Sequence, residues 1–127
     1  MGILEQIGSP EELRGLPRAA LPEVARELRH ELVQIGAEVG GHFGASLGAV
    51  ELTVALHWVF DTPRDRLVWD VGHQAYGHKA LTGRGAGLRR VKRSDGPSGF
   101  LRRAESGFDV FGAGGQSQAI AVVPAGL

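Results

Sequence analysis

The residues best suited to chemistry follow a short apolar run near the middle of the chain. The run 67–69 ends in Asp70, and Gly72 and His73 come directly after it. A strand that ends in a carboxylate, a tight turn and an imidazole directs polar groups to the carboxyl end of a sheet, where ligands bind in α/β proteins. The pattern predicts a ligand site around His73; the alternative is that Asp70 only caps the next helix.

Two further segments combine glycine with chemically useful groups. His42 lies in the glycine-rich stretch 40–48, where an imidazole can transfer protons near neutral pH and glycines admit a bulky ligand. A surface role for this histidine is an equal alternative. Gly114, Gly115 and Gln116 lie between a possible strand and a possible helix. Such a turn can bind phosphate on its backbone amides, although it matches neither a P-loop nor a dinucleotide fingerprint.

The other histidines favour simpler interpretations. His30 and His57 fall within helical patterns and are predicted to be structural. His73 and His78 are five residues apart, but the sequence offers no evident third ligand, so a metal site is not favoured.

A basic cluster follows these motifs. Residues 84–103 contain seven basic side chains against Asp95 alone. Such a cluster can meet nucleic acid or a phosphorylated small molecule, but a solvated loop face is the favoured interpretation. No aromatic residue lies between Arg84 and Arg93 to stack on bases, so nucleic acid is not an expected partner.

Composition limits the class of protein. The chain has 127 residues, 43% of them hydrophobic, with no net charge and no cysteine. These values suit one globular domain in a reducing compartment, the cytoplasm. No apolar run is long enough for a membrane span, and the acidic first segment does not match a signal peptide.

Several elements must position the motifs. Ser9 is predicted to cap a short helix beginning at Pro10, with Glu12 at the capping-box position. Apolar residues at spacings of three and four predict a helix from Leu21 to Val39 that Gly40 ends. We further expect a helix over 47–60 capped by Ser46, a turn over 61–65, a strand over 67–69, a helix over 74–81 stopped by Gly83, a strand over 108–111 and a helix over 117–123. A strand flanked by helices is typical of a parallel α/β sheet.

Together these segments resemble the 1-deoxy-D-xylulose-5-phosphate synthases, thiamine-diphosphate enzymes of the transketolase superfamily. The resemblance covers roughly residues 21–120. It rests on seven blocks in family order: 41–53, 55–57, 69–76, 78–79, 81–84, 98–100 and 105–106. It implies an α/β fold, the N-terminal part of a thiamine-diphosphate-binding, parallel-sheet domain that is incomplete. Residues 1–127 would form this partial domain on the diphosphate side, without the pyrimidine and C-terminal domains.

The resemblance also implies an activity. Enzymes of this family condense pyruvate with D-glyceraldehyde 3-phosphate, losing carbon dioxide, and supply isoprenoid and thiamine biosynthesis. His42 matches a histidine implicated in proton transfer, and His73 matches one that contacts thiamine diphosphate. Gly114, Gly115 and Gln116 align with a cofactor-contacting block, but Gly115 and Gln116 replace the family's histidine and serine.

What the family carries elsewhere limits the expected activity. Its Mg²⁺ ligands and the glutamate that activates the cofactor would lie beyond Leu127, so we expect the chain alone to be inactive. The resemblance predicts a homodimer, or completion by a second polypeptide. Exposed sheet edges and apolar faces over 119–123 favour marginal stability and self-association. The altered tail favours a frameshift near residue 115 over simple clipping. The alternative function is a non-catalytic interaction or regulatory module derived from such an enzyme.

Overall fold

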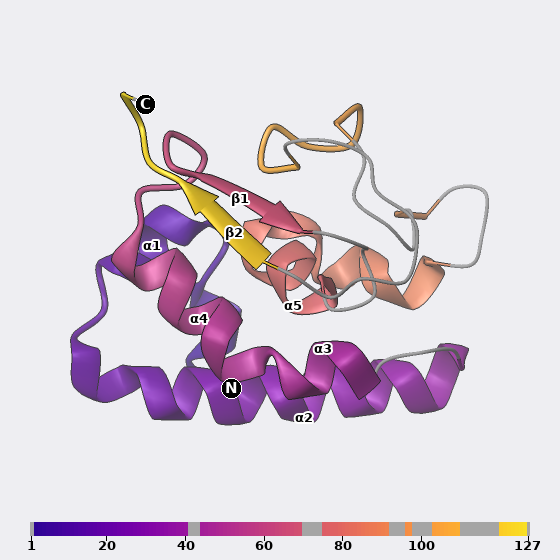
Figure 1. Cartoon of the computed structure of the whole chain (residues 1–127). Coiled ribbons are helices and arrows are strands. Elements are labelled where there is room, and N and C mark those ends of the chain that lie inside the picture. The colour runs from indigo at the N-terminus through magenta and orange to yellow at the C-terminus, as the bar shows by residue number, and fades with distance from the viewer. Residues whose placement is uncertain are drawn as a thin grey trace.

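The computed structural model arranges the chain in three tiers (Figure 1). The long helix α2 (Leu21–Val39) lies along one side, α4 (Val50–Val59) and α5 (Tyr76–Lys79) pack against it, and a two-stranded sheet lies beyond them. The structure describes residues 2–40, 44–69, 75–91, 96–97, 103–109 and 120–126, with only the backbone of Ala45. No helix in these ranges has both the length and the hydrophobicity that crossing a membrane requires.

The N-terminal segment contains a short 3₁₀ turn, η1 (Leu4–Gln6), and helix α1 (Pro10–Arg14). The Ser9 hydroxyl accepts a hydrogen bond from the Glu12 amide at 3.3 Å, which confirms the predicted cap. The Glu12 carboxylate reaches back to the Gly8 amide at 3.0 Å. The predicted capping box is therefore present, shifted by one residue on its return bond.

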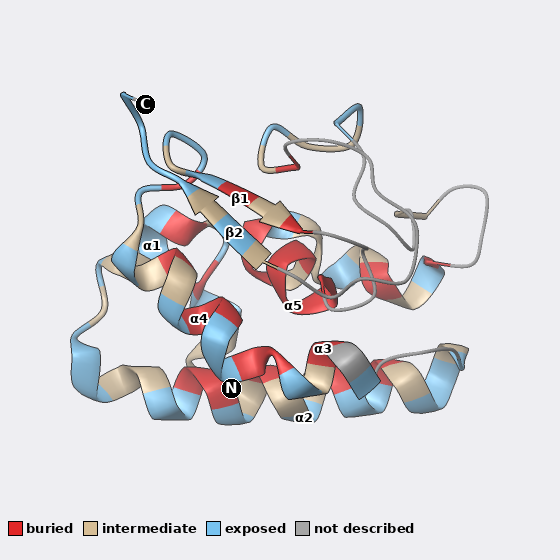
Figure 2. Ribbon diagram, viewed as in Figure 1, coloured by how far each residue is buried: buried red, intermediate tan, exposed pale blue. Residues whose placement is uncertain are grey.

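Helix α2 forms as its periodicity predicts. It follows the 3₁₀ turn η2 (Arg18–Ala20), and Gly40 ends it with a positive φ of 71°. Its inward residues form one buried stripe, which Figure 2 shows in red: Val24, Ala25, Leu28, Leu32 and Ile35. This stripe forms the largest part of the main hydrophobic core, which also includes Leu13, Val50, Leu81 and Leu88.

The predicted helix over 47–60 is divided into two. Helix α3 (Gly44–Gly48) precedes α4, and Ala49 leaves the helical conformation between them. Ser46 is not a helix cap: it lies inside α3 and is buried. The prediction was wrong because the Ser46 hydroxyl bonds a distant amide, as described below. The turn over 61–65 is confirmed.

The sheet confirms one predicted strand and corrects a predicted helix. Strand β1 (Arg66–Trp69) is present, but the predicted helix over 117–123 is wrong for 120–123, which form strand β2 (Ile120–Val123). The strands pair antiparallel, with Arg66 opposite Val123. Alternation places Ile120 and Val122 against the small second core of Leu67, Trp69 and Ala75. Burying every second side chain of the segment 120–123 in this way outweighs the helical preference inferred from its small residues.

The chain has the predicted α/β class, with one correction to its sheet. The pairing found among the described residues is antiparallel, where a parallel sheet was expected. The predicted strand over 108–111 is not formed at Phe108 or Asp109, and its remaining residues lie outside the described ranges. Helix α5 continues into a π-helical turn, η3 (Ala80–Arg84), where Gly83 adopts a φ of 93° and stops the helix as predicted. The 3₁₀ turn η4 (Ala86–Arg90) follows.

Candidate functional site

The residues predicted to bind the cofactor or transfer protons are not among those that the structure describes. His42, His73, Gly114, Gly115 and Gln116 all lie outside the described ranges, as does Asp70. Their roles therefore stay predictions. The described residues next to them can still be located.

The segments that follow His42 and His73 are joined by a buried hydrogen bond. The Ser46 hydroxyl, on α3, accepts from the backbone amide of Tyr76, the first residue of α5, at 3.1 Å. Ser46 is 1% exposed. An amide left without an acceptor in such a place would cost about 1 to 3 kcal/mol. In the chain, the two predicted histidines stand four residues before Ser46 and three before Tyr76, so this bond joins described residues close to both of them in sequence.

Near this contact the structure contains a buried polar network that the sequence did not predict. It connects α4, α5, η3 and the segment 103–109, which precedes Gly114 by only a few residues. Its members are buried or largely buried side chains that bond one another: His57, Thr62, His78, Lys79, Thr82, Arg84, Glu105 and Asp109.

One branch of the buried polar network runs through two histidines with a fixed direction. Asp109 Oδ1 lies 3.1 Å from His78 Nε2, and His78 Nδ1 lies 2.9 Å from His57 Nε2. An ionised carboxylate only accepts, so His78 donates from Nε2, and a neutral His78 ring then accepts at Nδ1 from His57. His57 Nδ1 is then the acceptor for the Thr62 hydroxyl at 2.9 Å. Both rings are neutral in this arrangement.

The other branch is ionic. Arg84 binds Asp109 through two bonds of 2.8 Å, one to each carboxylate oxygen, and reaches Glu105 at 2.8 Å. Lys79 binds the same oxygen of Glu105 at 2.8 Å. Two cations thus face two carboxylates in a region with little solvent. The favoured interpretation of Arg84 as part of a solvated basic face is wrong, since its side chain is only 12% exposed.

Burial sets the protonation of the buried polar network. Desolvation lowers the pKa of His57 to about 2, helped by the neighbouring His78 and Arg14. Desolvation also lowers the pKa of His78, outweighing the opposing hydrogen bond to Asp109, and lowers that of Lys79 against its bond to Glu105. The histidines are therefore neutral at pH 7, which fits the donor directions deduced from Asp109. The buried polar network therefore holds α4, α5, η3 and the segment 103–109 together.

The position of His57 agrees with the sequence analysis. His57 is structural, as predicted. Both ring nitrogens of His78 are taken by His57 and Asp109, which leaves no lone pair for a metal shared with His73. The described ranges contain no group of three residues that could hold a metal ion. Sequence reasoning included Glu105 only as part of a family block and missed Asp109; it predicted neither as a partner of Arg84, although two acids follow a basic run in a chain with no net charge.

Trp69 adds an unusual feature at the carboxyl end of β1. Its side chain is fully buried, and Nε1 has no hydrogen-bond partner among the described residues. The indole ring lies 5.3 Å from His78, centroid to centroid. Buried donors are seldom left unbonded. Trp69 directly precedes Asp70 in the chain, so this unsatisfied donor belongs to the residue next to the predicted ligand segment.

The helices around the buried polar network and the small sheet beside them define an α/β domain of the transketolase-like class, represented by its N-terminal part. The family model described as 1-deoxy-D-xylulose-5-phosphate synthase matches residues 4–126. The chain belongs to this family.

Curated relatives carry the same description. Synthases of this name from Magnetococcus marinus, Chromobacterium violaceum and Thiobacillus denitrificans are 55%, 54% and 56% identical over 118 residues. Each alignment covers 93% of this chain and 19% of the relative. The chain therefore spans about a fifth of the length of the curated relatives it matches.

Proposed function

We propose that this chain is the N-terminal part of a thiamine-diphosphate-dependent transferase that condenses pyruvate with D-glyceraldehyde 3-phosphate and releases carbon dioxide. Its family membership supports this activity. The observation that carries the proposal is the bond from the Tyr76 amide to Ser46. It joins the two segments that the resemblance assigns to proton transfer and to cofactor contact.

The residues present suit the cofactor. His73 would contact thiamine diphosphate, as would the block Gly114, Gly115 and Gln116, with Gln116 offering an amide where relatives of this family carry a hydroxyl. His42 would move a proton near the reacting carbon. The buried indole N–H of Trp69, the residue directly before the segment that carries His73, has no hydrogen-bond partner among the described residues. When bound, the thiazolium ring of the cofactor supplies stabilisation of the substrate carbanion.

The 127 residues taken alone are proposed to lack synthase activity. The chain spans 19% of the length of its relatives, and the resemblance assigns the family's Mg²⁺ ligands and activating glutamate to later parts of such enzymes. Without Mg²⁺ the diphosphate charge is poorly neutralised. The active form would therefore be a homodimer of a longer polypeptide or a complex with a complementing chain, located in the cytoplasm. Nucleic acid is not a proposed partner, because Arg84 and Arg89 are held in ion pairs with carboxylates.

A second candidate is a non-catalytic interaction or regulatory module. It is favoured by Gly115 and Gln116, which replace two cofactor-contacting side chains of the family. Co-purification with a full-length synthase, without thiamine diphosphate bound to this chain, would favour this candidate over the first.

The proposal is tested by titrating thiamine diphosphate and Mg²⁺ into the purified chain and following thermal unfolding. A ligand that binds only the folded state raises the melting temperature. We expect a saturable rise that His73→Ala abolishes and that His30→Ala, a change on the exposed face of α2, leaves intact. No rise in the unsubstituted chain would contradict cofactor binding by this part of the synthase.

A further inference from the structure

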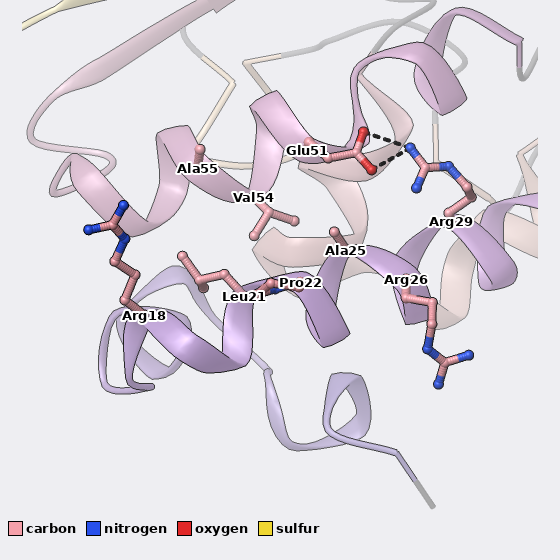
Figure 3. A pocket seen from close by; sticks show the side chains of 9 residues that line it. All are labelled: Arg18, Leu21, Pro22, Ala25, Arg26, Arg29, Glu51, Val54 and Ala55. Atoms are coloured by element: carbon pink, nitrogen blue, oxygen red, sulfur yellow. Dashed lines mark hydrogen bonds and ion pairs between the residues drawn. The ribbon is translucent and has the colours of Figure 1, made fainter.

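A groove with an apolar floor lies between the first half of α2 and α4 (Figure 3). Its volume is about 430 Å³. The floor is formed by short side chains from both helices: Leu21, Pro22, Ala25, Val54 and Ala55. Nothing in the proposed cofactor chemistry uses this surface.

The two ends of the groove differ in charge. At one end Arg18 points along the groove wall beside Ala55, and it has no carboxylate partner among the described residues. At the other end Arg29 binds both oxygens of Glu51, at 2.6 and 2.5 Å, so this pair closes the groove without a net charge. Figure 3 shows the three side chains in this order, with the apolar floor between them.

The N-terminus of α2 adds to the positive electrostatic potential around Arg18. Arg18 lies in η2, directly before the N-terminus of α2, where the helix dipole adds positive potential. Arg26 also lies at the rim, where Glu23 neutralises it. The groove therefore offers one unneutralised cation beside a strip of apolar surface.

We propose that this groove binds a small amphiphilic anion, an alkyl phosphate. The phosphate would pair with Arg18, and the alkyl chain would lie along Leu21, Ala25 and Val54 towards the Arg29–Glu51 pair. Leu21 and Ala25 are one helical turn apart, about 6 Å, which is room for a short chain. Ligand pockets commonly combine such an apolar lining with few polar anchors.

The charge pattern argues against a second copy of the chain as the occupant. Two copies meeting face to face would bring together two surfaces that each carry the unneutralised Arg18, and like charges in contact oppose association. An anion with an apolar tail satisfies both the cation and the floor. Its binding is independent of thiamine diphosphate, so this proposal and the proposed function can fail separately.

The test compares three probes by isothermal titration: hexyl phosphate, inorganic phosphate and hexanol. Each buried methylene is worth about fourfold in affinity, so hexyl phosphate should bind at least about tenfold more tightly than inorganic phosphate. It should also bind at least about tenfold more tightly than hexanol, which lacks the charge-assisted bonds to Arg18. Equal binding of hexyl phosphate and either fragment would overturn the proposal.

Matched variants place the site. Arg18→Gln should weaken hexyl phosphate about tenfold, whereas Arg64→Gln, at an arginine 76% exposed on the 61–65 turn, should not. Ala55→Glu should abolish binding, and Val33→Glu, at an exposed position of α2 outside the groove, should have no effect. Unfolding curves confirm that each variant folds. Equal effects of the paired variants would overturn the proposal.

Two further results would also overturn the proposal that the groove binds an alkyl phosphate. A sedimentation mass of a dimer that Ala55→Glu reduces to a monomer would assign the groove to a second copy. Binding to vesicles of anionic phospholipid, with none to hexyl phosphate, would assign it to a membrane surface.

Discussion

His57 and His78 share a buried hydrogen bond of 2.9 Å between Nε2 of the first ring and Nδ1 of the second. The rings stack with their centroids 5.0 Å apart. One residue lies on α4 and the other on α5, so the bond fastens these two helices to each other. Because Asp109 accepts from the far side of His78, the pair also connects both helices to the segment that leads towards Gly114.

The neutral state of this pair makes stability depend on pH. The pKa of His57 falls to about 2 in the folded chain and that of His78 is also lowered, against about 6.5 when unfolded. The unfolded state therefore binds more protons below about pH 6.5, and stability present above that pH is lost as pH falls. For His57 alone the free energy of unfolding should drop by about 2 kcal/mol between about pH 7 and about pH 5.

Urea unfolding over this pH range measures the effect. The charged groups around the pair are Arg14, Lys79, Arg84 and Asp109. His57→Gln should flatten the pH dependence, whereas His30→Gln, on the exposed face of α2, should preserve it. A pH dependence that survives His57→Gln unchanged would show that His57 is not its source.

Asp109→Asn tests the ionic branch of the buried polar network. Asp109 is 3% exposed and receives two bonds from Arg84 and one from His78. Removing its charge leaves Glu105 as the only counter-ion of Arg84 among the described residues, so the free energy of unfolding should fall by about 3 to 5 kcal/mol. Glu38→Gln, which breaks a solvent-exposed pair with Arg89, should cost less than about 1 kcal/mol. Equal losses in urea unfolding would refute a special role for Asp109.

Ser46→Ala tests the joint between α3 and α5. The variant removes the acceptor of the Tyr76 amide, and we expect a loss of about 1 to 3 kcal/mol. Hydrogen exchange at the Tyr76 amide should accelerate. Ser9→Ala serves as the comparison, because it removes a cap at α1 and should leave exchange at Tyr76 unchanged. Slow exchange at Tyr76 in Ser46→Ala would contradict this assignment.

Strand β2 offers a pair of adjacent residues on opposite faces of the sheet. Val122 packs against the core around Leu67 and Trp69, whereas Val123 is 40% exposed. Val122→Asp should lower the free energy of unfolding by about 2 kcal/mol or more, because it places a carboxylate against apolar side chains. Val123→Asp should change it by less than about 0.5 kcal/mol. Similar values for the two variants in urea unfolding would contradict the observed register.

Local signals in the sequence were sufficient for several elements. Ser9 and Glu12 determine where α1 begins, and the apolar stripe with Gly40 determines the length of α2. Both depend on neighbours within a few residues. Gly83 stops α5 for the same reason, since few residues other than glycine tolerate its φ of 93°. The family blocks were also recognisable without coordinates, because residue type and spacing are properties of the chain.

Long-range pairing decided the rest. The segment 120–123 is too short to show the alternating hydrophobic pattern of a strand. It forms a strand because it pairs with Arg66–Trp69. Ser46 is of a residue type that often caps helices, but its hydroxyl accepts a hydrogen bond from the Tyr76 amide instead. Four charged residues are of types that usually lie on a solvated surface, yet they neutralise one another in the interior: Lys79, Arg84, Glu105 and Asp109. Which charges meet depends on how distant segments pack, and sequence spacing does not reveal such contacts.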